Sequence, residues 1–173
     1  AVSTSEARLH EARTYPPPAG LAATANVRAE AYARAAADPT AFWEEAARRL
    51  EWADPWHTAH EWDPPVDGAV PAARWFVGGR LNVAYNCVDR HVEAGLGDRV
   101  AFHFEGEPGD RRSLTFAELQ REVARAANAL EALGVEPGDR VVVYLPVLLE
   151  TVVVTLAIAR IGAPCSSAAR ICT

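Results

Sequence analysis

The chain has 173 residues, of which 50% are hydrophobic and 23% are charged, as in ordinary soluble globular proteins. Its formal net charge is −6, which argues against a nucleic-acid-binding protein. All 17 basic residues are arginines, so the chain excludes a lysine Schiff base, a phosphate-loop lysine and a lysine nucleophile of its own.

The first elements in chain order are helical. Residues 1–25 are rich in Ala, Pro, Ser and Thr, and Pro16-Pro17-Pro18 predicts an extended, flexible arm. A short Ala-rich helix is predicted from Asn26, as its cap, to about residue 37. Asp38-Pro39 then starts another helix, because Asp is a favoured N-cap and Pro suits the first helical position. The predicted apolar face of this helix consists of Phe42, Trp43, Ala46, Ala47 and Leu50. The opposite face carries two predicted i,i+4 ion pairs, Glu44–Arg48 and Glu45–Arg49.

Residues 52–76 carry four of the five tryptophans, Trp52, Trp56, Trp62 and Trp75, among several prolines. Proline excludes a regular helix or a central strand here. Because an indole is costly to leave in water, we expect the rings to anchor this segment against a larger body. Two alternatives stay open: the rings pack on one another, or the segment is partly disordered.

An α/β pattern follows. Asn82 is predicted to cap a helix that runs to about residue 93, followed by strands at 100–104 and 112–114 joined by the loop 105–110. Thr115 and Glu118 form a capping box that opens a helix, and Gly134 closes it. The apolar stripe of that helix is Leu119, Val123, Ala126, Ala127, Leu130 and Leu133.

The last pattern is a strand and a helix. Residues 140–145 form a continuous apolar run, typical of a strand covered on both faces, and residues 147–161 form an apolar helix. Pro146, Glu150 and Arg160 interrupt this apolar region, which therefore does not predict a membrane span. A parallel sheet needs a further strand after the helix, but residues 164–173 show neither strand nor helix periodicity. The sequence therefore predicts a fold that is interrupted after residue 163.

Residues 75–91 read WFVGGRLNVAYNCVDRH. This stretch resembles the N-terminal region of AMP-forming acetyl-CoA synthetases, and the similarity runs from about residue 16 to residue 163. The matching positions are Trp75, Phe76, Gly79, Leu81, Asn82, Asn86, Cys87, Asp89, Arg90 and His91. The choice of acetyl over propionyl rests on the Asn86-Cys87 pair.

The resemblance implies an α/β fold: a helical and irregular N-terminal accessory region, then the first, incomplete part of the adenylate-forming large domain. We expect a flexible arm at 1–25, the accessory region at 26–94, the start of the AMP-binding domain at 95–163 and a divergent tail at 164–173. The full-length family uses ATP, Mg²⁺ and coenzyme A to convert acetate to acetyl-CoA, AMP and pyrophosphate. This chain lacks the phosphate loop, ribose-binding aspartate and catalytic lysine of the family. We therefore expect an inactive fragment that binds none of these cofactors alone.

Two hypotheses on partners remain. The chain either completes the remainder of the synthetase or is a self-standing module that binds a complementary chain; neither nucleic acid nor membrane is expected. Where the family continues with a segment like HSVVFGGFS, this chain has PCSSAARICT. A frameshift or truncated reading frame is the favoured explanation, and an authentic alternative terminus and an artificial end to the sequence remain the others.

No catalytic, cofactor-binding or metal-binding residue is assigned. Cys87 and His91 share a helix face, but we interpret Cys87 as a small buried hydrophobe rather than a nucleophile. Asp89, Arg90 and His91 are expected to make fold-specifying hydrogen bonds to a body outside this chain. The residues His57, His60, Glu61 and Asp63 fit no standard zinc spacing. Cys87, Cys165 and Cys172 form no CxxC pair, and without a secretory signal they predict reduced thiols in the cytoplasm.

Overall fold

The computed structural model describes residues 13–66, 68 and 70–167. Contacts divide the chain into two compact units, Ala1–Glu45 and Ala46–Thr173. None of the helices in the described part of the chain combines the length and hydropathy needed to span a bilayer.

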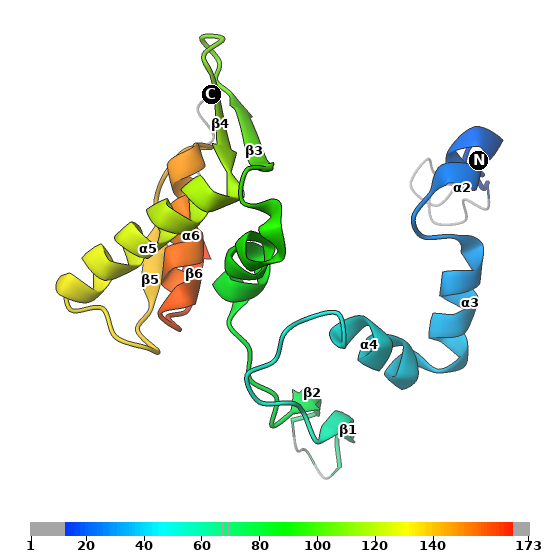
Figure 1. The fold of residues 1–173 in the computed structure, drawn as a ribbon. Helices are drawn as coiled ribbons and strands as arrows, with labels where there is room; N and C mark the ends of the chain where they lie inside the picture. Colours follow the sequence, from blue (N-terminus) through cyan, green and yellow to red (C-terminus); the bar gives the residue numbers. More distant parts are fainter. Residues whose placement is uncertain (1–12, 67, 69, 168–173) are drawn as a thin grey trace, which may run out of the picture. The chain divides into compact units, whose positions relative to one another are not determined.

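The first unit is helical (Figure 1). It contains α2 (Ala19–Thr24), α3 (Ala29–Ala37) and the larger part of α4 (Pro39–Ala47). A helix therefore lies within the segment predicted to be an arm; residues 1–12 of that prediction lie outside the described residues. Helix α3 begins at Ala29, after Arg28, and not directly after Asn26 as predicted.

Helix α4 begins where the sequence predicts. The Asp38 Oδ1 atom accepts a hydrogen bond from the Ala41 amide at 2.9 Å, which confirms the N-cap. The helix ends at Ala47, three residues before the end of the predicted apolar face, and Leu50 and Trp43 are exposed. Glu45 forms its ion pair with Arg34 at 3.0 Å, which differs from the predicted i,i+4 pair.

The tryptophan-rich segment of the second unit contains a hairpin that the sequence did not predict. Strands β1 (Thr58–Asp63) and β2 (Ala72–Val77) pair antiparallel, with His60 opposite Trp75. Both strands are edges, so neither contradicts the exclusion of a central strand.

Residues 83–96 form a helix that includes two π-helical turns, η1 (Tyr85–Asp89) and η2 (Val92–Leu96). The Asn82 Oδ1 atom accepts a hydrogen bond from the Tyr85 amide at 3.1 Å, as expected of the predicted cap. The helix extends past Glu93, and Gly95 ends its regular path at φ 79°. A π turn shifts the side chains that follow it around the helix axis, so the simple 3.6-residue period does not place them.

Strands β3 (Val100–Glu105) and β4 (Arg111–Thr115) form an antiparallel hairpin, as predicted, which leads directly into α5 (Phe116–Ala132) (Figure 1). Both bonds of the capping box are present: the Glu118 amide donates to Thr115 Oγ1 at 3.2 Å, and the Thr115 amide donates to Glu118 Oε2 at 2.8 Å. The buried stripe ends before Leu133, which is 81% exposed and corrects the prediction at that residue.

Strand β5 (Val141–Val143) and helix α6 (Leu149–Arg160) are both shorter than predicted. Val143 is buried, but its neighbour Val142 is 67% exposed, so the described residues cover only one face of β5. The prediction that β5 is covered on both faces is wrong for this chain. A continuous hydrophobic run indicates that both faces of a strand favour burial, but it does not show that the chain contains the residues to cover them.

Strand β6 (Cys165–Ser167) pairs in parallel with β5. The Val141 amide also donates to the Pro164 carbonyl at 3.0 Å. The prediction that the fold stops after residue 163 is therefore wrong for residues 165–167. Backbone groups alone make this ladder, so a strand forms where the side chains show no alternation.

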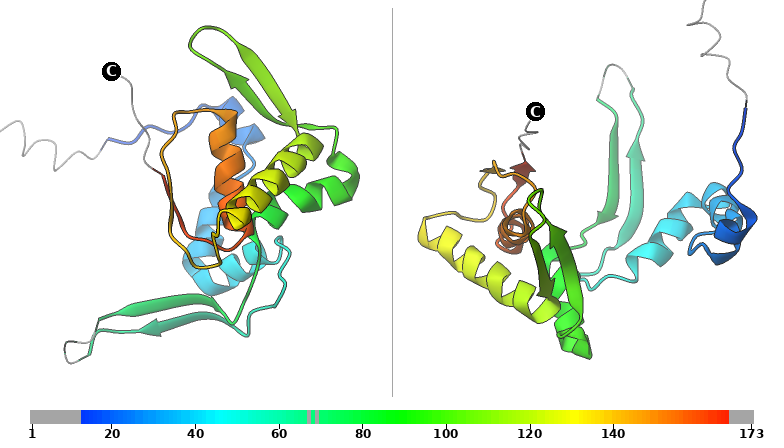
Figure 2. Two further views of the ribbon diagram at one scale, coloured as in Figure 1. Left: turned by 90° about the vertical axis from the view of Figure 1, so that its left-hand side faces the viewer. Right: turned by 90° about the horizontal axis from the view of Figure 1, so that it is seen from above.

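The core of the second unit lies between α5, α6, η1 and β5. Figure 2 shows α5 and α6 side by side. One buried cluster contains Val88, Leu119, Val123, Ala127 and Ala157, and the other contains Val143, Ile158 and Ala163.

Candidate functional site

The residues that carry the sequence motif gather around the helix 83–96. Asn82 stands at its start and makes two kinds of bond: it caps the helix, and its Nδ2 atom donates to the Arg160 carbonyl at 2.9 Å. One side chain therefore ties the first turn of this helix to the last turn of α6.

Asp89 is buried and accepts hydrogen bonds on both carboxylate oxygens. Gln120 Nε2 of α5 donates to Oδ1 at 2.7 Å, and Arg160 Nη2 of α6 donates to Oδ2 at 2.6 Å. The Asp89 and Arg160 side chains are 10% and 27% exposed, so little solvent screens this ion pair. Three helices therefore meet at one carboxylate.

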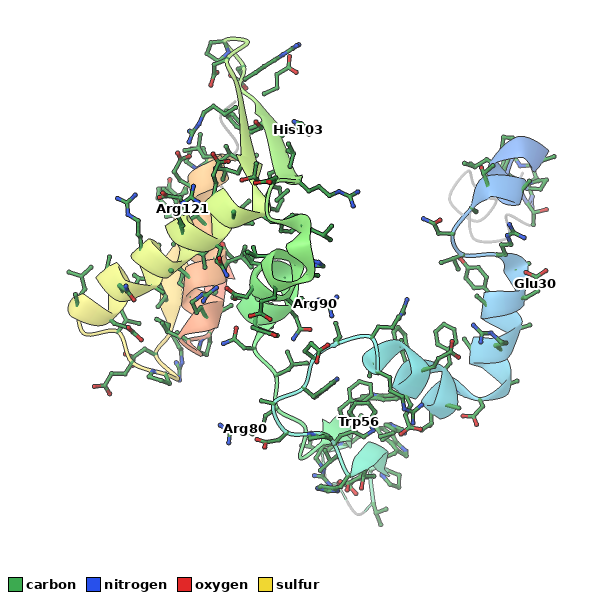
Figure 3. All side chains as sticks on the ribbon, in the orientation of Figure 1. Glu30, Trp56, Arg80, Arg90, His103 and Arg121 are labelled. Atoms are coloured by element: carbon green, nitrogen blue, oxygen red, sulfur yellow. The ribbon has the colours of Figure 1, made fainter. Side chains whose placement is uncertain are left out.

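Asn86 and Arg90 lie on the same helix and hold the turn that follows α4. Asn86 Oδ1 accepts from the Glu51 amide at 2.9 Å, and Asn86 Nδ2 donates to the Glu51 carbonyl at 2.9 Å. Arg90, labelled in Figure 3, donates from Nη1 to the Arg49 carbonyl at 2.8 Å. An amide side chain that pairs with both backbone groups of one residue fixes the path of that turn as a strand ladder would.

The aromatic part of the motif lies at the base of the β1–β2 hairpin, where Figure 3 labels Trp56. The rings of Trp52, Trp56 and Phe76 lie within 4.9–5.6 Å of one another between centroids. Gly79 is required there, since a Cβ at this position would lie 2.5 Å from the Trp52 ring. These rings pack on one another, the alternative left open above, whereas Trp62 and Trp75 of the hairpin are 54% and 41% exposed.

The remaining motif residues differ from their predictions. Cys87, which lies in η1, is exposed in this chain and is therefore not the buried hydrophobe expected. His91 packs against the Phe116 ring with centroids 5.0 Å apart. Asp89 and Arg90 find their partners within this chain, so the expectation of partners in a missing body is wrong for both.

Sequence patterns missed the partners of these residues. Gln120 lies beside the apolar stripe of α5, and Arg160 is the last residue of an apolar helix; each reads as an ordinary surface residue. The signal that could have identified them is a polar side chain at the edge of an apolar helix face, where a buried polar group elsewhere in the chain would find its hydrogen-bond partner.

The titratable groups with shifted pKa values include three that form hydrogen bonds between structural elements or at helix ends. Hydrogen bonds from the Thr115 backbone and side chain lower the pKa of Glu118, and the hydrogen bond from Arg112 lowers the pKa of Glu150. The hydrogen bond to Glu93 raises the pKa of the Tyr85 hydroxyl. Each shift has a structural cause, which is a capping hydrogen bond at Glu118, an ion pair at Glu150 and a bond to a carboxylate at Tyr85.

Three of the residues considered above as possible zinc ligands make contacts between the two strands of the β1–β2 hairpin. Glu61 and Asp63 bind Arg74 at 2.9 and 2.8 Å, and the His60 ring stacks on Trp75 with centroids 4.2 Å apart. In the described ranges, no group of three or more His, Cys, Asp or Glu side chains is arranged to hold a metal ion.

An open groove of about 430 Å³ lies beside this cluster of motif residues. Its lining comes from η1, β3, α5 and α6 and includes Cys87, Phe102, Phe116, Val152 and Thr155. A second cavity of about 390 Å³ is lined in part by Arg112, Arg121, Glu118, Glu122 and Glu150. The carboxylates in the second cavity would repel a phosphate group.

Two family models match adjacent parts of the chain: the acetyl-coenzyme A synthetase N-terminus at residues 28–87 and the AMP-binding enzyme family at residues 88–169. An acetyl-coenzyme A synthetase of Streptomyces avermitilis is 62% identical over 155 residues, which cover 90% of this chain and 23% of the relative. Along this length the chain matches the acetyl-coenzyme A synthetases. It corresponds to the N-terminal part of these ligases.

Further acetyl-coenzyme A synthetases agree. One from Mycobacterium tuberculosis is 55% identical over 159 residues, which cover 91% of this chain and 24% of the relative. Among solved structures, an acetoacetyl-CoA synthetase from Streptomyces lividans matches with a TM-score of 0.70 and 28% identity, over 88% of this chain and 26% of that one. The chain thus spans about a quarter of the length of the synthetases it matches.

The network around Asp89 spans the boundary between the two family models. Asn82 and Asn86 lie in the synthetase N-terminus match, whereas Asp89, Gln120 and Arg160 lie in the AMP-binding match. The hydrogen bond from Asn82 to Arg160 therefore joins the two matched regions.

Proposed function

We propose that this chain is the N-terminal portion of an AMP-forming acetate–CoA ligase, which makes acetyl-CoA, AMP and pyrophosphate from acetate, ATP and coenzyme A. The observation that supports this most is the 62% identity across 90% of the chain, through the whole Trp75–His91 motif. The role of this portion is structural: it supplies the accessory region and the first strands and helices of the AMP-binding domain. The ligase is proposed to act in the cytoplasm, with Mg²⁺ accompanying ATP, and without nucleic acid.

The residues present do not fit ATP or coenzyme A. Helix N-termini are the usual phosphate sites, but a carboxylate already stands at the N-terminus of each of the four longer helices: Glu30 at α3, Asp38 at α4, Glu118 at α5 and Glu150 at α6. The chain has no lysine, and no charged residue lines the groove at η1. No step of the reaction is therefore assigned to residues of this chain, and the chain alone is proposed to be inactive.

The alternative function is a binding module that pairs with a complementary chain. The open groove favours it, as do the uncovered face of β5 and the free edges of the two-stranded β5–β6 sheet. On this alternative the partner need not be a synthetase.

A chimaera separates the two functions. It joins residues 1–163 of this chain to the part of the Streptomyces avermitilis synthetase that follows its matching segment. Acetate-dependent ATP–pyrophosphate exchange is expected from the chimaera and is expected to be absent with the purified chain alone. A folded chimaera without exchange activity would contradict the proposal, and exchange by the chain alone would contradict the proposed inactivity. The chimaera with Asp89→Asn tests whether the motif supports the fold, since its loss of activity should follow its loss of stability.

A further inference from the structure

The groove beside the motif cluster is formed by four elements of the second unit. Its lining includes Cys87 of η1 and Phe102 of β3. Phe116 and Leu119 of α5 and Val152 and Leu156 of α6 contribute further apolar side chains to the lining. Phe102 is 37% exposed and the Cys87 side chain is exposed, so the groove opens to solvent.

The two hydroxyl groups of the groove are already bonded within α6 and the turn before it. Thr151 Oγ1 donates to the Pro146 carbonyl at 2.7 Å, and Thr155 Oγ1 donates to the Thr151 carbonyl at 2.8 Å. Both threonines can therefore present methyl groups without leaving a donor unpaired. With no charged side chain in the lining, the groove matches an apolar occupant and not a phosphate or carboxylate ligand.

Helix α6 is apolar around its circumference. Val153, Leu156 and Ala157 pack in one core cluster, and Val154 and Ile158 pack in the other. Val152 belongs to neither cluster and lines the groove. A helix that is hydrophobic on all sides is typical of a position covered by protein on all sides, and the described residues cover Val152 and Leu156 only in part.

The relatives contain enough additional polypeptide to supply that cover. They match this chain along 155 residues at 62% identity, yet those residues are 23% of their length. We infer that the groove seats an apolar helix or strand from the remaining part of the synthetase, which packs against Phe102, Phe116 and Val152. This inference rests on the proposed function. It assigns to Cys87 a buried position in the assembled enzyme, although the thiol is exposed in this chain.

Cys87 provides the test. The isolated chain and the chimaera are treated with a maleimide, and peptide mass spectrometry follows the labelling of Cys87 itself over time. Labelling in the folded chimaera is expected to be at least about 10-fold slower than in the isolated chain, because a covered thiol reacts only when the cover opens. In denaturant the two rates should be equal, which controls for the local sequence.

Each result decides a separate question. An active chimaera with Cys87 labelled at the isolated-chain rate overturns the inference and leaves the proposed function standing. An inactive chimaera with a protected thiol supports the inference and contradicts the proposed function. An inactive chimaera with an unprotected thiol contradicts both. Protection of Cys87 in the chimaera that grows with the concentration of the chimaera identifies a second copy as the occupant and overturns the inference.

A pair of substitutions tests the groove without using the thiol. Val152→Glu places a charge in the groove, whereas Leu133→Glu places one at an 81% exposed site at the end of α5. In the isolated chain Leu133→Glu should leave the melting temperature unchanged, whereas Val152→Glu should lower it because Val152 is partly buried, so labelling is compared below both melting temperatures. In the chimaera Val152→Glu should abolish Cys87 protection and Leu133→Glu should retain it. Equal protection in both variants overturns the inference.

Discussion

The Asp89 carboxylate accepts hydrogen bonds from Gln120 and Arg160, which come from two different helices. Asp89→Asn keeps the shape of the side chain and removes the charge that faces Arg160. Since Arg160 is 27% exposed, solvent compensates part of the loss, and we expect a decrease of about 2 kcal/mol in the free energy of unfolding. Denaturant unfolding followed by circular dichroism measures it.

Glu105→Gln is the control for that measurement. Its ion pair with Arg111 lies at the surface, with side chains 61% and 76% exposed, and surface pairs contribute little. No resolvable change is expected. If Asp89→Asn destabilised the chain no more than Glu105→Gln does, the Asp89 network would not support the fold.

Glu118 makes the stability of α5 depend on pH. Hydrogen bonds from Thr115 lower its pKa in the folded chain below the ordinary value of 4.5. A lowered folded-state pKa gives a stabilisation that is complete above the ordinary value and is lost as the pH falls through the lowered one. Glu118→Gln keeps an acceptor for the Thr115 amide but cannot titrate. The melting temperature of the variant should therefore fall less than that of the parent between about pH 5 and about pH 3. Parallel decreases would contradict this prediction.

Among the elements, β6 is held by backbone pairing with β5. Deleting residues 164–173 removes the Pro164 acceptor and the three pairs from Val141–Cys165 to Val143–Ser167. Amide exchange at Val141, which donates to Pro164, should accelerate by at least about 10-fold. Deleting only residues 168–173 is the matched control, and it should leave the exchange rate unchanged. Acceleration in the control, or none in the longer deletion, would contradict the role of β6.

Most elements whose signals are local were predicted well, although the helix predicted after Asn26 begins only at Ala29. The Asp38 cap, the Asn82 cap and the Thr115–Glu118 box each depend on residues within three positions, and the structure contains all three. Capping bonds form from the sequence around a helix end, whatever packs on the rest of the helix.

Elements that depend on distant partners were predicted poorly. The β1–β2 hairpin and β6 form through cross-strand bonds between residues that show no alternation, and β5 is covered on one face only. The exposure of Cys87 depends on what packs against the helix 83–96, which the spacing within that helix does not report. Of the candidate site, the sequence identified the motif residues, but it did not identify Gln120 and Arg160 as their partners.

For the whole molecule, exposed apolar surface favours association of copies of the chain, whereas the net charge opposes it. Many large hydrophobic side chains remain exposed, among them Trp62, Trp75, Phe102, Val142 and Tyr144. The net charge of −6 opposes association of copies, and salt screens that repulsion. The isolated chain should therefore self-associate more at high concentration and high salt, as measured by sedimentation velocity. A monodisperse monomer at all concentrations and salt levels would contradict this prediction and favour a self-standing module.

The bonds of Asn82 and Asp89 to Arg160 span 78 and 71 residues of sequence. During synthesis at roughly 5–20 residues per second, Arg160 is added about 4–14 s after Asp89. Through that interval the helix 83–96 has its local cap but lacks the guanidinium that neutralises its buried carboxylate. The accessory region therefore cannot reach its final stability before Arg160 has been added. Until α6 is complete, the unpaired helix 83–96 remains available to a chaperone that binds nascent chains.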